Sequence, residues 1–152
     1  MVSHEIAEFF EAGHSLHIGT RGADLQPSGT RAWAVEVSAD RAHMTVFVMT
    51  AGAVALRRDL EGQPEVALTC GRVDDHVTWQ AKGHCVEVRP ARVAERERVT
   101  RQAETFRDHL ATIGITRDLT AGWRYWPCIA VRFKVAELFN QTPGPGAGER
   151  VK

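Results

Sequence analysis

The sequence predicts a mainly β protein with helices, folded as one small antiparallel barrel of six strands that is closed or nearly closed. Three observations lead to this prediction. The chain has 152 residues, 43% of them hydrophobic and 25% charged, which is the composition of a single globular domain. Apolar and polar residues alternate in six short segments that are separated by turns. Segments of helical character precede the first strand, fall in the middle of the chain and precede the last strand, which places helices at the ends of a barrel.

The chain is expected to begin with a short helix over residues 3–12. Ser3 can cap its start, and Gly13 can close its end. Ile6 and Phe10 are one turn apart, so they share the face that this helix buries.

Three strands are expected to follow in a meander. Strands over 16–20 and 28–37 form a hairpin around a polar turn, and Arg31 and Trp33 fall on one face of the second strand. Residues 44–50 are apolar on both faces, which predicts a strand in the middle of the sheet.

The middle of the chain predicts a connecting helix and two more strands. Residues 53–61 have helical composition, and Gly62 marks their end. Strands are expected over 66–70 and 77–88. Gly83 inside the second of these indicates a bulge or a close approach of another backbone.

The last part predicts the longest helix and the final strand. Residues 92–113 place apolar side chains at steps of three and four, with a charged opposite face. Residues 128–139 alternate as a strand, and the Pro/Gly-rich segment 141–148 can hold neither helix nor sheet. We therefore expect one domain over 1–140 and a tail over 141–152.

Charge and composition exclude several classes of partner. Nineteen Lys and Arg balance nineteen Asp and Glu, so the broad positive field that attracts nucleic acid is missing. No apolar stretch approaches the ~20 residues that cross a bilayer, and the first residues lack the pattern of a signal peptide. We expect a cytoplasmic protein with no nucleic-acid or membrane partner.

The cysteines and histidines do not suggest a metal site. Cys70, Cys85 and Cys128 are odd in number and lie in apolar or alternating segments, which is typical of buried free thiols in a reducing compartment. His14 and His17 would share a face only in a helix, and the sequence around them predicts a strand.

Six phrases occur in a fixed order along residues 10–146. They are Leu16-His17-Ile18-Gly19-Thr20, Pro27-Ser28-Gly29-Thr30-Arg31-Ala32-Trp33, Phe47-Val48-Met49-Thr50, Pro64-Glu65-Val66-Ala67-Leu68, Gln80-Ala81-Lys82-Gly83 and Phe139-Asn140-Gln141-Thr142-Pro143-Gly144-Pro145-Gly146. Together they resemble the FMN-binding split-barrel family related to pyridoxamine 5'-phosphate oxidase. The resemblance implies a six-stranded antiparallel split β-barrel, a homodimer, and FMN in a groove at the dimer interface. It does not extend to that oxidase itself, because the chain ends in a Pro/Gly segment without the oxidase's further basic residues.

The resemblance also implies which residues bind the cofactor. Arg31 matches the second-strand arginine that holds the FMN phosphate, with Ala32 and Trp33 beside it, and Thr50 matches the hydroxyl residue that closes the third strand. Considered without the resemblance, Arg31 can instead form an ion pair with Glu36 or Asp59, and Thr50 can simply cap the next element.

The chain departs from the family at the start of the linking helix. Where a serine and a basic residue are common, it has Val54, Ala55 and Leu56, which supply no charged donor for a phosphate. Arg57 and Arg58 are the candidates to replace them. Successive helical residues are rotated by roughly 100°, so only one of the two is expected to face the groove.

Further candidates concern the flavin ring. Gln80 and Lys82 point to the same side of their strand and can contact the polar edges of the ring, or they can simply face solvent. Trp126, in a cluster with Trp123 and Tyr125, can form a wall over the ring or belong to the core.

Three functions remain open from the sequence. The first is an FMN-dependent oxidoreductase acting on an unknown small molecule, with no catalytic residue identified. The second is a non-catalytic module that binds flavin, deazaflavin or haem for storage or sensing, with His17, His76 or His84 as candidate haem ligands. The third is an interaction domain without a cofactor.

Overall fold

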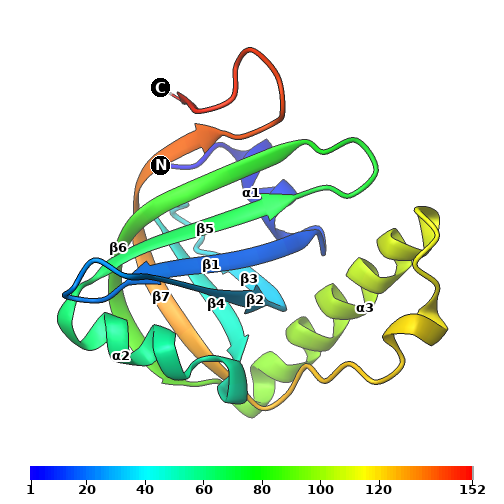
Figure 1. The fold of residues 1–152 in the computed structure, drawn as a ribbon, viewed down its shortest axis with the longest axis horizontal. Coiled ribbons are helices and arrows are strands. Elements are labelled where there is room, and N and C mark those ends of the chain that lie inside the picture. The colour runs from blue at the N-terminus through cyan, green and yellow to red at the C-terminus, as the bar shows by residue number, and fades with distance from the viewer. Residues whose placement is uncertain (152) are drawn as a thin grey trace.

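The structure is a computed structural model that describes residues 1–151. Within these residues the chain forms three α-helices and eight strands (Figure 1). Their bounds, in chain order, are α1 His4–Glu11, β1 Ser15–Arg21, β2 Pro27–Ala32, β3 Ala34–Val37, β4 His43–Met49, α2 Val54–Gly62, β5 Glu65–Gly71, β6 Thr78–Pro90, α3 Arg96–Thr112, β7 Cys128–Asn140 and β8 Glu149–Arg150.

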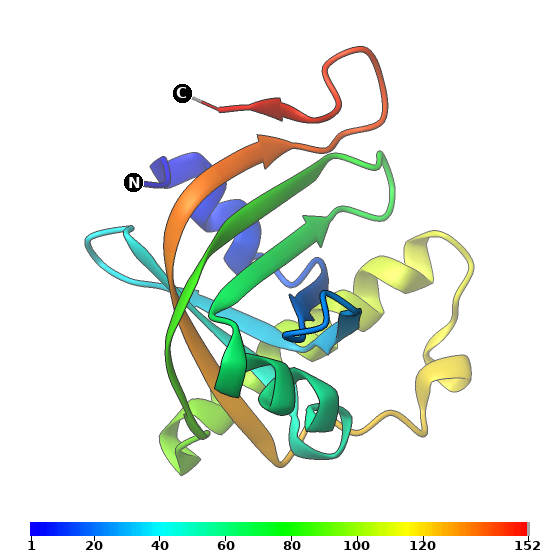
Figure 2. The ribbon, with the colours of Figure 1, turned by 60° about the vertical axis from the view of Figure 1, so that its left-hand side comes forward.

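All strands belong to one antiparallel sheet that curls into a barrel (Figure 2). The strand order is β2-β1-β5-β6-β7-β4-β3, and β8 pairs with the end of β7. The two edge strands, β2 and β3, are separated in the chain by Trp33 alone. The sheet therefore curls round on itself, and the predicted mainly β barrel with helices is confirmed.

The single strand expected over 28–37 is wrong in one respect, because it divides at Trp33. Residues before Trp33 pair with β1, and residues after it pair with β4. The Trp33 amide donates a hydrogen bond of 2.9 Å to the Phe47 carbonyl. The chain thus passes from one edge of the sheet to the other at this residue.

The core fills the concave side of the sheet. Ile18, Leu68, Ala81 and Phe133 project inward from four neighbouring strands and are buried. The register between β6 and β7 shifts at Lys82/Gly83, so the bulge expected near Gly83 is confirmed.

The ends of the described chain lie together at one end of the barrel (Figure 1). Residues 141–148 are irregular, as expected, but Glu149 and Arg150 then pair with Asn140 and Phe139. The sequence did not predict this short strand, because two residues carry no pattern. None of the helices in residues 1–151 has the length and apolar character needed to span a membrane.

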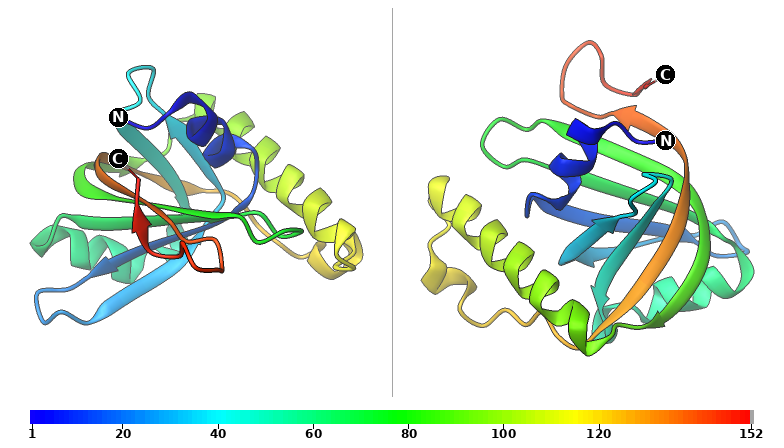
Figure 3. Two further views of the ribbon diagram at one scale, coloured as in Figure 1. Left: turned by 90° about the horizontal axis from the view of Figure 1, so that it is seen from above. Right: turned by 180° about the vertical axis from the view of Figure 1, so that it is seen from behind.

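Helix α3 lies beside the edge strand β3 (Figure 3). The buried Gln102 side chain takes the place of a neighbouring strand: its Oε1 accepts from the Val35 amide at 3.0 Å, and its Nε2 donates to the Val35 carbonyl at 2.8 Å. Both polar groups of a buried edge residue are thereby satisfied.

Replacing Gln102 by leucine is expected to lower the free energy of unfolding by about 2–4 kcal/mol, because it leaves a buried amide and a buried carbonyl without partners. Urea unfolding measures the change. Arg101→Leu, on the exposed side of the same helix, is the control and is expected to stay within about 0.5 kcal/mol of the wild type. Equal losses in the two variants would contradict this role for Gln102.

Candidate functional site

Side chains on the outer face of the sheet form rows that cross several strands. Because strand pairing aligns residues side by side, each row can be followed through the pairing of β2, β1, β5, β6 and β7. One row consists of Arg31, His17, Thr69, Gln80 and Phe139. The next consists of Gly29, Gly19, Ala67, Lys82 and Glu137.

At the start of the second row, Gly29, Gly19 and Ala67 leave part of the outer face almost free of side-chain atoms, and this part is called the floor below. A Cβ atom added at Gly19 or at Gly29 would come no closer than 3.7 Å or 3.8 Å to other atoms of the chain. Neither glycine has a positive φ, so the chain itself does not require glycine there. A surface hollow of about 530 Å³ covers part of this floor, with Gly19, Ala67 and Lys82 in its lining. The outer face of the sheet thus has a flat, open area, and nothing in the folding of the single chain requires this area to be free of side chains.

Arg31 lies at one end of this face, among three aromatic rings. Its guanidinium carbon is 5.0 Å from the centre of Phe106, 5.7 Å from Trp33 and 5.8 Å from Trp123. Rings at such distances stabilise the cation. Within residues 1–151 the Arg31 side chain makes no ion pair and no hydrogen bond, and its Nη1 is buried without a partner. Burial lowers the pKa of Arg31.

The ion pairs considered for Arg31 are wrong. Glu36 instead accepts a hydrogen bond from Arg98 at 2.9 Å. The buried Asp59 accepts from the Thr20 hydroxyl at 3.0 Å and from Arg58 Nη2 at 2.9 Å. The neighbouring Ser28 hydroxyl, the Arg58 guanidinium and the Thr20 hydroxyl hold the pKa of the Asp59 carboxyl below its usual value. Both carboxylates considered for Arg31 are therefore paired with other arginines.

The Trp123 ring that covers Arg31 belongs to a segment fixed to α3. Arg107 Nε donates to the Thr120 hydroxyl at 2.8 Å, and the Tyr125 hydroxyl donates to Glu104 at 2.9 Å. Trp33 packs between Trp123 and Tyr125, with ring centres at 5.3 Å and 5.0 Å. The aromatic surroundings of Arg31 are thus built from Trp33 between β2 and β3, from α3 and from the loop before β7.

Thr50 is not brought to the Arg31 side chain. It begins the turn Thr50–Gly52, where a Cβ at Gly52 would lie 3.3 Å from the Thr30 hydroxyl, so this turn packs against Thr30. Adjacent residues of a strand point to opposite faces, so Thr30 and Arg31 project in opposite directions. Ala32, the other predicted neighbour of Arg31, is buried and points inward.

In the described residues, the side chains of Arg57 and Arg58 in α2 make no hydrogen bond or ion pair with the residues around Arg31. Arg58 is occupied by Asp59. Arg57 is exposed and makes no ion pair with another described residue. Sequence reasoning missed the cluster in which the exposed Arg58 and the buried Thr20 both bond to the buried Asp59, because Thr20 and Asp59 come from distant segments.

Gln80 and Lys82 do share the outer face. Gln80 Nε2 donates to the Thr69 hydroxyl at 3.0 Å, and Gln80 Oε1 accepts from Gln141 at 3.4 Å. The Lys82 ammonium lies 4.8 Å from the centre of the Phe139 ring. Trp126 instead packs on the cluster beside α3, under Arg96 at 6.0 Å. The structure therefore joins Arg31, Gln80 and Lys82 on one face and leaves Trp126 elsewhere.

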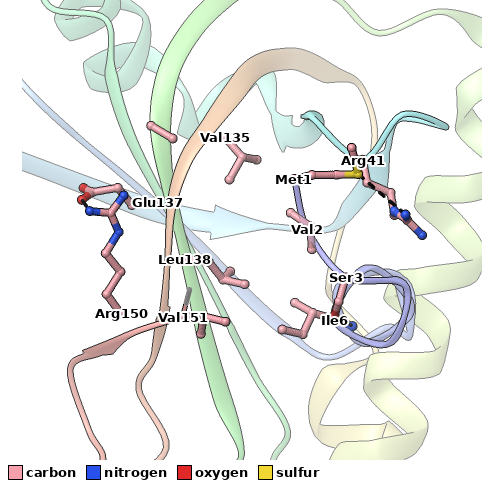
Figure 4. Close-up of a pocket in the computed structure, with 11 residues that line it drawn as sticks. Met1, Val2, Ser3, Ile6, Arg41, Val135, Glu137, Leu138, Arg150 and Val151 are labelled. Carbon is pink, nitrogen blue, oxygen red and sulfur yellow. Dashed lines mark hydrogen bonds and ion pairs between the residues drawn. The ribbon is translucent and has the colours of Figure 1, made fainter.

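A larger cavity, of about 740 Å³, lies at the end of the barrel between α1 and β7 (Figure 4). Apolar side chains line it, among them Val2, Ile6 and Leu138. Arg41 at its edge donates to the Met1 sulfur at 3.7 Å. None of the predicted site residues borders this cavity.

The thiols are buried to different degrees. Cys70 and Cys128 are buried and Cys85 is half-buried, and none of the three is in a disulfide. Burial raises the pKa of all three thiols, and that of Cys128 to about 12. In residues 1–151 no group of three His, Cys, Asp or Glu side chains is placed to hold a metal ion.

Comparisons with solved structures show the fold. The chain is similar to an F420 reductase (12% identity, 90% of this chain and 98% of that chain, TM-score 0.62). It is also similar to a putative pyridoxamine 5'-phosphate oxidase from Lactobacillus delbrueckii (14%, 91% and 93%, 0.57) and an FMN-binding protein from Syntrophomonas wolfei (9%, 88% and 81%, 0.59). No protein-family model and no curated protein matches the chain. These neighbours are split barrels of the pyridoxamine 5'-phosphate oxidase type, and the present chain has that fold.

Proposed function

We propose that the protein binds FMN on the outer face of the sheet and uses it as an oxidoreductase acting on a small molecule. The observation that carries the proposal is Arg31, a partly buried guanidinium with no carboxylate partner and no hydrogen bond within the described chain. A buried donor without a partner is rare in native proteins, and an anionic ligand supplies what is missing.

The donor set fits a flavin mononucleotide. Arg31 supplies charged donors for the phosphate. Gln80 lies three strand intervals away in the same row, which is roughly 14 Å at the usual spacing of strands. The glycine and alanine floor lies in the adjacent row and leaves space for a flat ring. The residues present therefore match an anionic head, a flat body and a polar edge.

The chain's own groups have distinct tasks in this proposal. Arg31 holds the phosphate and fixes the position of the ligand. Hydrogen bonds with Thr69 and Gln141 hold the Gln80 amide in one orientation. The amide therefore offers the ring edge one hydrogen-bond donor and one acceptor in fixed positions. Lys82 places a positive charge on the same face, where it favours negative charge on the ring. When bound, the flavin supplies the electron transfer. Thr50, Arg57, Arg58 and Trp126 have no part in this proposal.

Three assays test the proposal. The purified protein is expected to show a band near ~450 nm, and mass identification of the extracted cofactor is expected to give FMN. Extraction of a deazaflavin or of haem, which has an intense band near ~400 nm, would replace FMN by the alternative cofactor. If a candidate substrate reduces the bound flavin, so that the band disappears, and the band returns on reoxidation through repeated turnovers, the protein is an enzyme. A band that no candidate substrate changes identifies a binding or sensing module.

We further propose that two copies of the chain pack through this outer face. Light scattering at micromolar concentration is expected to show a dimer, because a ligand that lies on the open outer face of one chain is enclosed when a second copy packs over that face. Gly19→Leu is expected to give a folded monomer. The control Gly62→Leu, at a position with no atom within 4 Å of an added Cβ, is expected to stay dimeric. A stable wild-type monomer would contradict the interface.

A further inference from the structure

His17 is the neighbour of Arg31 across the pair of strands β1 and β2. The two residues are direct partners in the register, so their Cβ atoms lie about 4.5–5.5 Å apart on the same face. His17 is accessible to solvent, and its ring makes no hydrogen bond or ion pair within residues 1–151. Two groups able to carry positive charge thus stand side by side without an acidic partner.

We infer that His17 is the second anion-binding group of this site, and that its ring takes up a proton from solvent when a dianion binds beside Arg31. The inference rests on the proposed anion site at Arg31, but it does not depend on the anion being FMN. A phosphate monoester and a sulfate share the required chemistry, which is a compact dianion that accepts several hydrogen bonds.

Among the described residues, the neighbours of His17 on the outer face, other than Arg31, carry no charge. On β5 its neighbour is Thr69, and beyond Thr69 lies Gln80 on β6, neither of which titrates. The next residues on this face are Ser15 and Gly19 along β1, Gly29 and Trp33 on either side of Arg31, and Ala67 and Gly71 on either side of Thr69, and none of them titrates. Arg31 is therefore the charged group that acts on the ring.

The direction of the effect follows from these neighbours. Partial burial and the charge of Arg31 both lower the pKa of His17 in the free protein. A bound dianion offsets the charge of Arg31 and accepts a hydrogen bond from the protonated ring. It must then raise the pKa of His17, and by linkage the protonated ring must bind the dianion more tightly.

Sulfate is the probe, because it remains a dianion across the pH range used. NMR of the His17 ring is expected to show its titration midpoint rising by about one pH unit in saturating sulfate, which is a tenfold change in proton affinity. Calorimetry is expected to show sulfate affinity falling about tenfold between about pH 5 and 8 in the wild type. His17→Gln is expected to show no such dependence. His4→Gln, an exposed histidine on α1, is the control and is expected to behave as the wild type.

The outcomes separate this inference from the proposed cofactor. Sulfate binding that depends on His17 in a protein that does not bind FMN would leave the inference standing and defeat the flavin proposal. Binding of FMN with an unchanged His17 titration in both ligands would overturn the inference and leave the flavin proposal standing. If neither sulfate nor FMN binds and the titration of the His17 ring does not change in their presence, both the inference and the flavin proposal are overturned.

Discussion

Replacing Arg31 by alanine is expected to weaken FMN binding by about 10- to 100-fold and to leave riboflavin binding within a few-fold of the wild type. The deleted guanidinium acts on the phosphate, where a charged hydrogen bond contributes about 1.5–3 kcal/mol, and hardly on the ring. Titration of apoprotein with each flavin, followed by fluorescence, measures the two dissociation constants.

Two further variants make the result specific to Arg31. Arg31→Lys keeps a positive charge but loses the planar fork of donors, so an intermediate affinity for FMN is expected. Arg57→Ala removes an exposed arginine and is expected to leave both affinities unchanged. Because Arg31 has no carboxylate partner, its removal is not expected to cost the about 3–5 kcal/mol that breaking a buried ion pair costs. Equal losses of FMN and riboflavin would defeat the phosphate assignment.

Replacing Gly83 by alanine is expected to lower the free energy of unfolding by at least about 3 kcal/mol. An added Cβ would overlap the Lys134 carbonyl oxygen and would lie 3.0 Å from a ring carbon of Phe133. Both obstacles belong to the neighbouring strand β7, so the two longest strands would have to separate at the bulge. Urea unfolding measures the loss.

Gly62→Ala is the matched control for Gly83→Ala. Gly62 ends α2, and nothing lies within 4 Å of a Cβ added there. We expect this variant to be as stable as the wild type or slightly more stable, because alanine restricts the unfolded chain. A similar small effect in Gly83→Ala would show that β6 and β7 can move apart easily.

The sequence was informative wherever a pattern stays within one segment. Alternation located the barrel strands, and the isolated Gly83 in an alternating run predicted the bulge. The division at Trp33 was missed because Trp33 continues the alternation on both sides, and alternation records which face a residue takes but not which strand is its partner. Only the pairing of distant strands reveals where the partner changes.

The candidate site, like the fold, was predictable only where its residues belong to one segment of the chain. Gln80 and Lys82 are two residues apart in one strand, so their shared face follows from the sequence. The surroundings of Arg31 do not, because Phe106 and Trp123 come from a distant helix and loop. The predicted acidic partner failed for a related reason: Arg98 of α3 binds Glu36, and no local pattern indicates that a helix residue will reach that strand.

The place of β7 in the sheet bears on how the chain folds during synthesis. β7 lies between β6 and β4, and it is the last long strand to leave the ribosome. Until it emerges, β4 has one unpaired edge along the apolar residues Val46, Phe47 and Val48, and β6 has another. Exposed edges of this kind pair readily with other chains. The nascent protein is therefore most prone to aggregate between translation of Met49 and translation of β7, and the barrel cannot close before residues 129–134, which pair with both β4 and β6, are made.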